Sequence, residues 1–122
     1  MPDLISDAMN GLMNAKRAGK MKISVPTSKF LIEVLEIMKK NNYLKDYENK
    51  EGKLIIEMGE FNECKSIRPR SYVKKEEIER FVRRFLPARD FGIIIVSTSK
   101  GLMIHKEAQD KHLGGSLIAY VY

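Results

Sequence analysis

The stretch from Gly92 to Gly101, GIIIVSTSKG, constrains the fold more than any other part of this sequence. Four large aliphatic residues in succession are typical of a strand that is buried on both faces of a sheet. The three hydroxyl residues that follow, Ser97, Thr98 and Ser99, must therefore lie where this strand reaches the rim of the sheet. The sequence thus predicts a buried strand that ends in a cluster of short polar side chains.

The hydroxyl cluster has a structural and a functional interpretation. One hydroxyl at the end of a strand commonly caps a turn. Three in succession, next to Lys100 and Gly101, also suit contact with a sugar-phosphate backbone, because hydroxyls donate and accept hydrogen bonds and glycine allows close approach. A-form RNA displays its 2′-hydroxyls in a shallow minor groove that short side chains reach. The cluster therefore indicates RNA contact, with a turn cap as the alternative.

The charge distribution points to the same class of partner. The net charge is +6, and the stretches Ala8–Ile32 and Lys65–Lys75 contain basic residues but no acidic ones. A positive excess favours nucleic acid or an anionic membrane as partner. No apolar stretch approaches the roughly 20 residues that span a bilayer, and the single cysteine, Cys64, fits a reducing compartment. We therefore expect a cytoplasmic protein that does not bind membranes.

Catalytic and metal-binding interpretations find little support. Ser97, His105 and Asp110 supply the residue types of a hydrolase triad, but the Gly-x-Ser-x-Gly elbow is missing. STSKG also lacks the glycine and lysine spacing of a P-loop. Cys64, His105 and His112 lack metal-ligand spacing, so the cysteine is predicted to be inert and both histidines to lie on a helix surface. We expect no enzyme activity, no cofactor and no metal.

The first half of the chain predicts the order α-β-α-β-β, with two helices covering one face of a sheet. Thr27 or Ser28 is the expected cap of the second helix, and the polar residues Asn49 to Gly52 form the expected hairpin turn. The expected elements are a helix from the cap Asp3 to about Gly19, a strand at Lys20–Val25, a helix from Lys29 to about Asn41, and strands at Tyr43–Glu48 and Lys53–Met58.

The second half predicts a small sheet with short helices. Ile67 to Arg70 is a connector, because Pro69 disfavours helix at and before its position. The expected elements are a short strand at Tyr72–Val73, a helix at Lys75–Leu86, a strand at Phe91–Ser97, a helix from Met103 to about His112, and a strand at Ser116–Tyr122. The fold class is therefore α+β, with an N-terminal α/β domain at 1–66 and a C-terminal β-rich domain at 67–122 that carries the hydroxyl loop.

Motifs along the whole chain carry a resemblance to a known family. STSKGLM, KEA at Lys106–Ala108 and GGSLIAYVY at Gly114–Tyr122 resemble the closing signature of the small-subunit ribosomal protein eight family, the universal S-eight family called S-fifteen-a in eukaryotes. NAKRAGK at Asn14–Lys20 and PTSK at Pro26–Lys29 resemble its N-terminal landmarks. IRPRSYVKKEE and RFLPARDFGIIIVSTS are most similar to its archaeal branch.

The resemblance implies a structural constituent of the small ribosomal subunit. Such a protein binds the central domain of small-subunit rRNA, helps to assemble the platform and contacts neighbouring ribosomal proteins. Its two halves pack side by side. A family member can also bind an mRNA that mimics its rRNA site. A free RNA-binding regulator, with its own mRNA as partner, is therefore the alternative function.

The resemblance and the basic stretches together name the expected RNA-binding residues. The hydroxyl loop would enter the minor groove and select an RNA shape, while basic residues would add salt-sensitive affinity. Tyr72 either contacts a base or is a half-buried strand tyrosine. The expected residues are Ser97, Thr98, Ser99, Lys100 and Gly101 of the loop, then Tyr72, Arg68, Arg70, Lys74, Ser28, Lys29, Gly114 and Gly115.

Two positions depart from the family pattern. Ile104 stands where archaeal relatives usually have Ser or Thr, so the helix that follows lacks a side-chain cap, at a cost of roughly 0.5–2 kcal/mol. His112 stands where glycine is common, and it would be strained if that site requires a left-handed backbone. Both departures concern the short helix and leave the loop residues unchanged.

Overall fold

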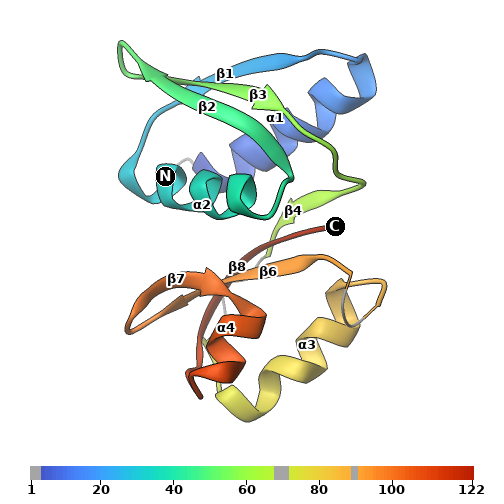
Figure 1. The fold of residues 1–122 in the computed structure, drawn as a ribbon, viewed down its shortest axis with the longest axis vertical. Coiled ribbons are helices and arrows are strands. Elements are labelled where there is room, and N and C mark those ends of the chain that lie inside the picture. The colour runs from blue at the N-terminus through green and yellow to red at the C-terminus, as the bar shows by residue number, and fades with distance from the viewer. Residues whose placement is uncertain (1–3, 68–71, 89–90) are drawn as a thin grey trace. The chain divides into compact units, whose positions relative to one another are not determined.

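The computed structural model describes residues 4–67, 72–88 and 91–122. The chain forms two compact units, Met1–Lys65 and Ser66–Tyr122, each containing helices and antiparallel strands (Figure 1). The predicted α+β fold class is confirmed.

The first unit has the predicted order α-β-α-β-β. Its elements are α1 (Leu4–Ala18), β1 (Lys22–Pro26), α2 (Lys29–Lys40), β2 (Leu44–Lys50) and β3 (Lys53–Met58). The strands form an antiparallel sheet in the order β1-β3-β2, and both helices lie on the same face of it (Figure 1). The predicted cap Asp3 lies outside the described residues.

The core of the first unit lies between these helices and the sheet. Met9, Leu12, Leu31, Leu35, Leu54 and Ile56 are all fully buried. Helix α2 starts where the sequence predicted, because the Ser28 hydroxyl accepts a hydrogen bond from the N–H of Leu31 at 3.1 Å. Ser28, and not Thr27, is therefore the N-cap.

The β2–β3 turn is shorter than predicted. Asn49 and Lys50 were expected in the turn, but they pair with Leu54 and Lys53 across the hairpin. The turn consists of Glu51 and Gly52, whose φ angles of 51° and 79° are both positive, as in the two-residue turns that match the twist of paired strands. The pairing between the two strands thus includes Asn49 and Lys50, although their polar character alone suggested a loop.

The second unit is built on a sheet in the order β4-β8-β6-β7, with β5 also paired to β8. Its elements are β5 (Tyr72–Val73), the short 3-10 helix η1 (Lys75–Glu77), α3 (Ile78–Phe85), β6 (Ile93–Thr98), β7 (Gly101–Ile104), α4 (His105–Asp110) and β8 (Gly115–Val121). Strand β4 (Cys64–Ser66) spans the boundary between the units. Strand β6 lies between β8 and β7, and Ile93 to Val96 are all buried, as predicted.

Helices α3 and α4 complete the core of the second unit. Ile78 and Val82 of α3 and Ala108 of α4 belong to one buried cluster with Ile94 and Val96 of the central strand. The helix predicted at Lys75–Leu86 is confirmed, with its first turn in the 3-10 form. The apolar stripe of α3 therefore covers the sheet beneath the strand that carries the hydroxyl cluster.

The prediction places the start of the next helix too early, at Met103. Residues Gly101 to Ile104 form β7, which pairs with β6 through Ser97↔Leu102, Val96↔Met103 and Ile95↔Ile104, and the helix begins at His105. Leu102 to Ile104 pair with β6 in the hairpin, and this pairing outweighs the helical preference of their sequence. As expected, Ile104 is the N-cap and makes no side-chain capping bond within the described residues.

His105 was predicted on a helix surface, and this prediction is wrong. Its side chain is 1% exposed, and its Nδ1 accepts a hydrogen bond from the backbone N–H of Ile94 at 3.1 Å. Ile94 lies one residue beyond the last β6–β7 pair. The imidazole therefore continues the hydrogen bonding of β6 where strand β7 has turned into α4.

Candidate nucleic-acid interface

The hydroxyl cluster lies at the tip of the β6–β7 hairpin. Thr98 pairs with Gly101, so Ser99 and Lys100 form a two-residue turn. Ser97 and Thr98 belong to β6 and are partly buried, whereas Ser99, Lys100 and Gly101 are exposed. The cluster is therefore not uniform, because only its second half projects beyond the sheet.

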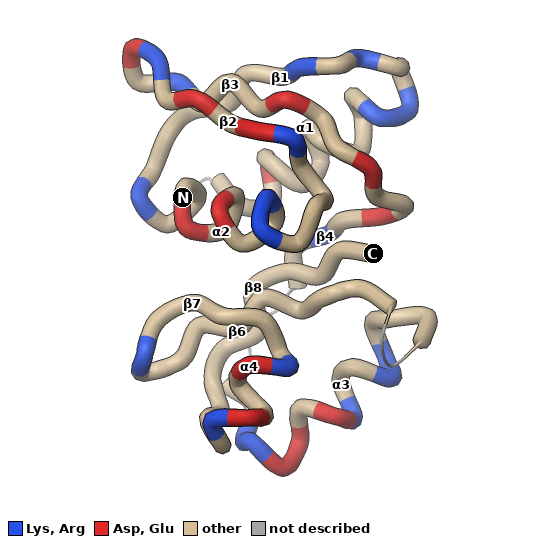
Figure 2. The backbone as a smooth tube through the Cα atoms, in the orientation of Figure 1, with Lys and Arg blue, Asp and Glu red and all other residues tan. Residues whose placement is uncertain are grey.

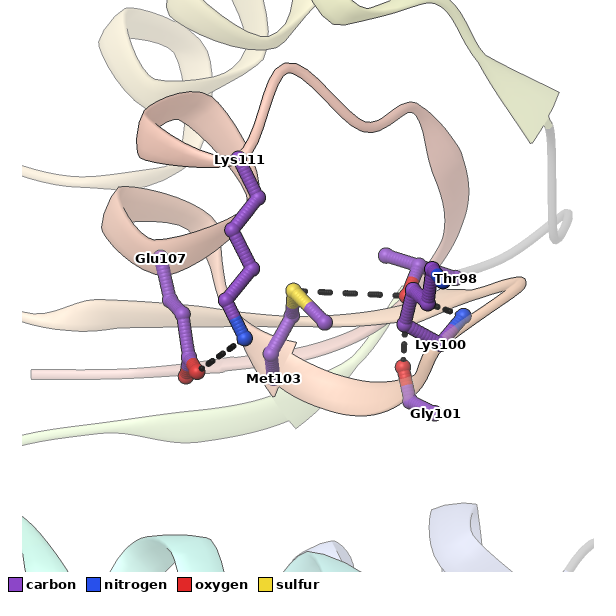
Figure 3. A network of polar contacts seen from close by, with 6 residues as sticks. All are labelled: Thr98, Lys100, Gly101, Met103, Glu107 and Lys111. Atoms are coloured by element: carbon purple, nitrogen blue, oxygen red, sulfur yellow. Dashed lines mark hydrogen bonds and ion pairs between the residues drawn. The ribbon is translucent and has the colours of Figure 1, made fainter.

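The Thr98 hydroxyl stabilises the turn itself. Its Oγ1 donates a hydrogen bond to the carbonyl of Gly101 at 2.8 Å and accepts one from the N–H of Lys100 at 3.1 Å (Figure 3). The same oxygen lies 4.0 Å from the sulfur of Met103. The turn-cap interpretation is thus correct for Thr98, and it leaves the Ser99 hydroxyl and the Lys100 ammonium for other partners.

Ser99 borders a hollow of about 450 Å³ in the second unit. The residues that line this hollow are Tyr72, Lys74, Lys75, Glu76, Ser99, His112, Leu113 and Gly114. Four of the predicted RNA-binding residues, Tyr72, Lys74, Ser99 and Gly114, thus come together. Sequence reasoning did not include Lys75 or His112 in the site, although Lys75 ends the predicted basic stretch.

Tyr72 is available for contact with a ligand. It pairs with Ser116 at the start of β8, and it is 71% exposed. The interpretation of Tyr72 as a half-buried strand tyrosine is therefore wrong. An exposed ring beside lysines and a serine hydroxyl is the combination that stacks on or contacts an unpaired base.

The glycine pair at the start of β8 has a packing role that the prediction did not include. A Cβ on Gly115 would lie 2.2 Å from the carbonyl oxygen of Ser97, and one on Gly114 would lie 2.5 Å from that of Val73. Gly115 is buried, whereas Gly114 is partly exposed in the hollow. Gly115 thus lets β8 lie close to β6, the strand that carries the hydroxyls, whereas Gly114, just before β8, lets the chain lie close to Val73 of β5.

The remaining predicted residues lie elsewhere in the chain. Arg68 and Arg70 lie outside the described residues. Ser28 and Lys29 lie at the N-terminus of α2 in the first unit, where Ser28 caps the helix and Lys29 is exposed. In the second unit, β6, β7 and β8 carry no charged residue, and the described lysines and arginines lie on turns, loops and helices (Figure 2). Lys65 lies on β4, a further strand of the same sheet.

Cys64 shows no sign of reactivity. It is 2% exposed, and its Sγ lies 3.6 Å from the carbonyl oxygen of Met9, to which it donates a hydrogen bond. Burial raises the pKa of the thiol from 9.0 to about 12, with a smaller contribution from Glu63.

Among residues 4–67, 72–88 and 91–122, no helix is long and apolar enough to cross a membrane.

We expect the folded protein to resist thiol reagents. At pH 8 the raised pKa leaves about 1,000-fold less thiolate than in the unfolded chain, so modification by a disulfide reagent should require unfolding. Because the folded state holds the proton more tightly, this thiol adds stability below pH 9 that is lost as the pH rises from 9 to about 12. Absorbance of the released reagent, with and without denaturant, measures this, and rapid labelling of the folded protein would contradict it.

Comparison with known proteins identifies the family. The family model described as ribosomal protein S8 matches residues 3–122. A small ribosomal subunit protein uS8 of Archaeoglobus fulgidus is 46% identical, covering 98% of this chain and 98% of the relative. The relative of the same name in Nanoarchaeum equitans is 44% identical over the same shares. The uS8B protein of Candida albicans is 38% identical, covering 98% of this chain and 96% of the relative.

These matches confirm the resemblance that the motifs indicated. They span both units, and the identities lie well above the level at which a shared family is in question. The chain therefore belongs to the ribosomal protein S8 family.

Proposed function

We propose that this protein is a structural, non-enzymatic constituent of the small ribosomal subunit that binds the central domain of small-subunit rRNA and helps to assemble the platform. Relatives that match nearly the whole chain are named small ribosomal subunit proteins. One observation carries the molecular part of the proposal: an exposed serine hydroxyl, an exposed tyrosine ring and lysine side chains line a single hollow.

Some side chains at this hollow are suited to selecting an RNA shape, and others are suited to adding affinity for RNA. The Ser99 hydroxyl donates and accepts, so it is suited to a 2′-hydroxyl or a base edge in the minor groove. Tyr72 offers a ring face to an unstacked base. Lys74 and Lys75 of the hollow, and Lys100 next to Ser99 in the turn, are suited to phosphates, which supply affinity that falls with salt. Thr98 supports the turn from which Ser99 projects.

Replacing Ser99 with alanine should weaken binding of an archaeal central-domain rRNA fragment by about 0.5–1.5 kcal/mol, the range for one lost hydrogen bond. The melting temperature should stay unchanged, because Ser99 is exposed. Thr98→Ala is the matched control. It removes two hydrogen bonds of the turn, so it should lower both stability and affinity. Filter binding and thermal unfolding give the two readings.

Lys74 provides the contrast in the same experiment. Lys74→Ala should lower the slope of log affinity against log salt by about 1, whereas Ser99→Ala should leave that slope unchanged. If Ser99→Ala weakens binding to a scrambled RNA hairpin as much as to the rRNA fragment, Ser99 is not a selective residue. A salt slope that Lys74→Ala leaves unaltered would remove Lys74 from the interface.

Cosedimentation tests the ribosomal role itself. The purified chain should cosediment with small ribosomal subunits depleted of their own uS8 protein at moderate salt, and it should prefer the central-domain fragment to the scrambled hairpin. Failure of both measurements would overturn the proposal. Tight binding to an RNA outside the ribosome without cosedimentation would instead identify a free RNA-binding regulator.

A further inference from the structure

Helices α1, α2 and α4 end in the same way, and His112 occupies the special position of the last one. In α4 the N–H of Leu113 donates to the carbonyl of Ala108 at 2.9 Å, and the N–H of His112 donates to that of Gln109 at 3.1 Å. This pair of bonds is a Schellman motif, whose key residue has a left-handed backbone. His112 has φ of 57°, which confirms the strained conformation that the sequence suggested.

The other two helix ends place better suited residues at the equivalent position. Gly19 ends α1 with φ of 71°, and Asn42 ends α2 with φ of 68°. Glycine has no Cβ penalty in the left-handed region, and asparagine tolerates it better than most residues. Histidine is therefore the least expected residue of the three, and it stands at the end that borders the hollow.

Strain in a folded protein persists where the surrounding structure holds it, and such positions gather at ligand sites. The His112 residue is exposed and lines the hollow together with Tyr72, Ser99 and Lys74. Within the described residues its ring makes no hydrogen bond or ion pair. The neighbouring Lys111, by contrast, is paired with Glu107 at 3.1 Å (Figure 3). The imidazole is thus an uncommitted donor at the rim.

We propose that His112 is a further RNA-binding residue of this site, whose imidazole donates a hydrogen bond to a backbone phosphate of the bound RNA. This inference rests on the proposed function. Lys74 and Lys75 border the same hollow, with Glu76 as the acidic member of its lining, so a phosphate there meets a mainly cationic rim. The role of the His112 side chain in RNA binding explains why histidine stands at a left-handed position that favours glycine.

The test separates binding from strain. His112→Gly removes the ring and suits the left-handed backbone, so its melting temperature should equal or exceed that of the wild type. Its affinity for the archaeal central-domain fragment should nevertheless fall about 3- to 10-fold, the range for one lost hydrogen bond. Asn42→Gly is the matched control, since it changes the same helix-end motif in the first unit. This control should keep its affinity within twofold.

A second variant tests the donor role. His112→Asn retains an N–H donor at a left-handed position that asparagine tolerates, so it should bind the fragment more tightly than His112→Gly. Wild-type affinity in His112→Gly, or equal weakening in both variants, would overturn the inference while leaving the proposed function intact. If the wild-type chain neither cosediments with the depleted small subunits nor prefers the central-domain fragment to the scrambled hairpin, both proposals fall.

Discussion

Gly115→Ala should destabilise the protein by about 3 kcal/mol, at the upper end of the cost of overpacking. The added methyl would lie 2.2 Å from the carbonyl oxygen of Ser97 and 3.0 Å from a methyl of Val96. A flexible side chain could move away, but the carbonyl belongs to the central strand β6. Strand β8 must therefore shift away from β6 and break its pairing between Ser97 and Ser116.

The effect reaches the RNA site because Ser97 begins the hydroxyl cluster on β6. Gly115→Ala should therefore lower both the urea midpoint and the affinity for the rRNA fragment. Gly11→Ala is the control for the substitution itself. A Cβ at Gly11 meets its nearest atom, a methyl of Ile23, at an ordinary 3.6 Å, and alanine in a helix stabilises by about 0.5–1 kcal/mol. Equal urea midpoints for the two variants would show that the close approach to Ser97 is unimportant.

His105→Ala should cost about 2–4 kcal/mol of stability. The substitution empties a buried volume and leaves the N–H of Ile94 without the acceptor that lies 3.1 Å away. This hydrogen bond ties the start of α4 to the central strand, next to the β6–β7 hairpin. Hydrogen exchange should therefore accelerate at the Ile94 amide more than at amides of the first unit, and urea unfolding should give the total loss.

His105→Asn separates the hydrogen bond from the packing. The side-chain oxygen of asparagine can replace Nδ1 as the acceptor, so this variant should retain about 1 kcal/mol that the alanine variant loses. It should also keep more protection at the Ile94 amide. If the two variants unfold at the same urea concentration with the same exchange rate, the buried histidine stabilises through its volume alone.

Much of the fold was predictable because local patterns determine it. The helix expected up to about Gly19, the strand expected after it and the expected cap of the second helix agree with the elements of the first unit to within a few residues. The run from Ile93 to Val96 predicts a central strand, because successive apolar residues are all buried only where both faces of the sheet are covered. Motifs alone were sufficient to indicate the family.

The candidate site was predictable only in part. The sequence identified the hydroxyl cluster as one group, but it does not separate Thr98, which holds the turn, from Ser99, which projects from it. That difference depends on the hairpin register, which pairs Thr98 with Gly101. Tyr72 was uncertain for the same reason, because its exposure depends on which strand β5 joins.

The sequence by itself therefore determined the order of the elements in the first unit, the buried central strand and the family, since these follow from residue patterns over short distances. The tertiary structure decided that residues Gly101 to Ile104 form a strand, that His105 is buried, and that His112 meets Tyr72 and Ser99 around one hollow. These outcomes depend on contacts between residues far apart in the chain. Pairing and burial there outweigh the local preference that a sequence pattern reports.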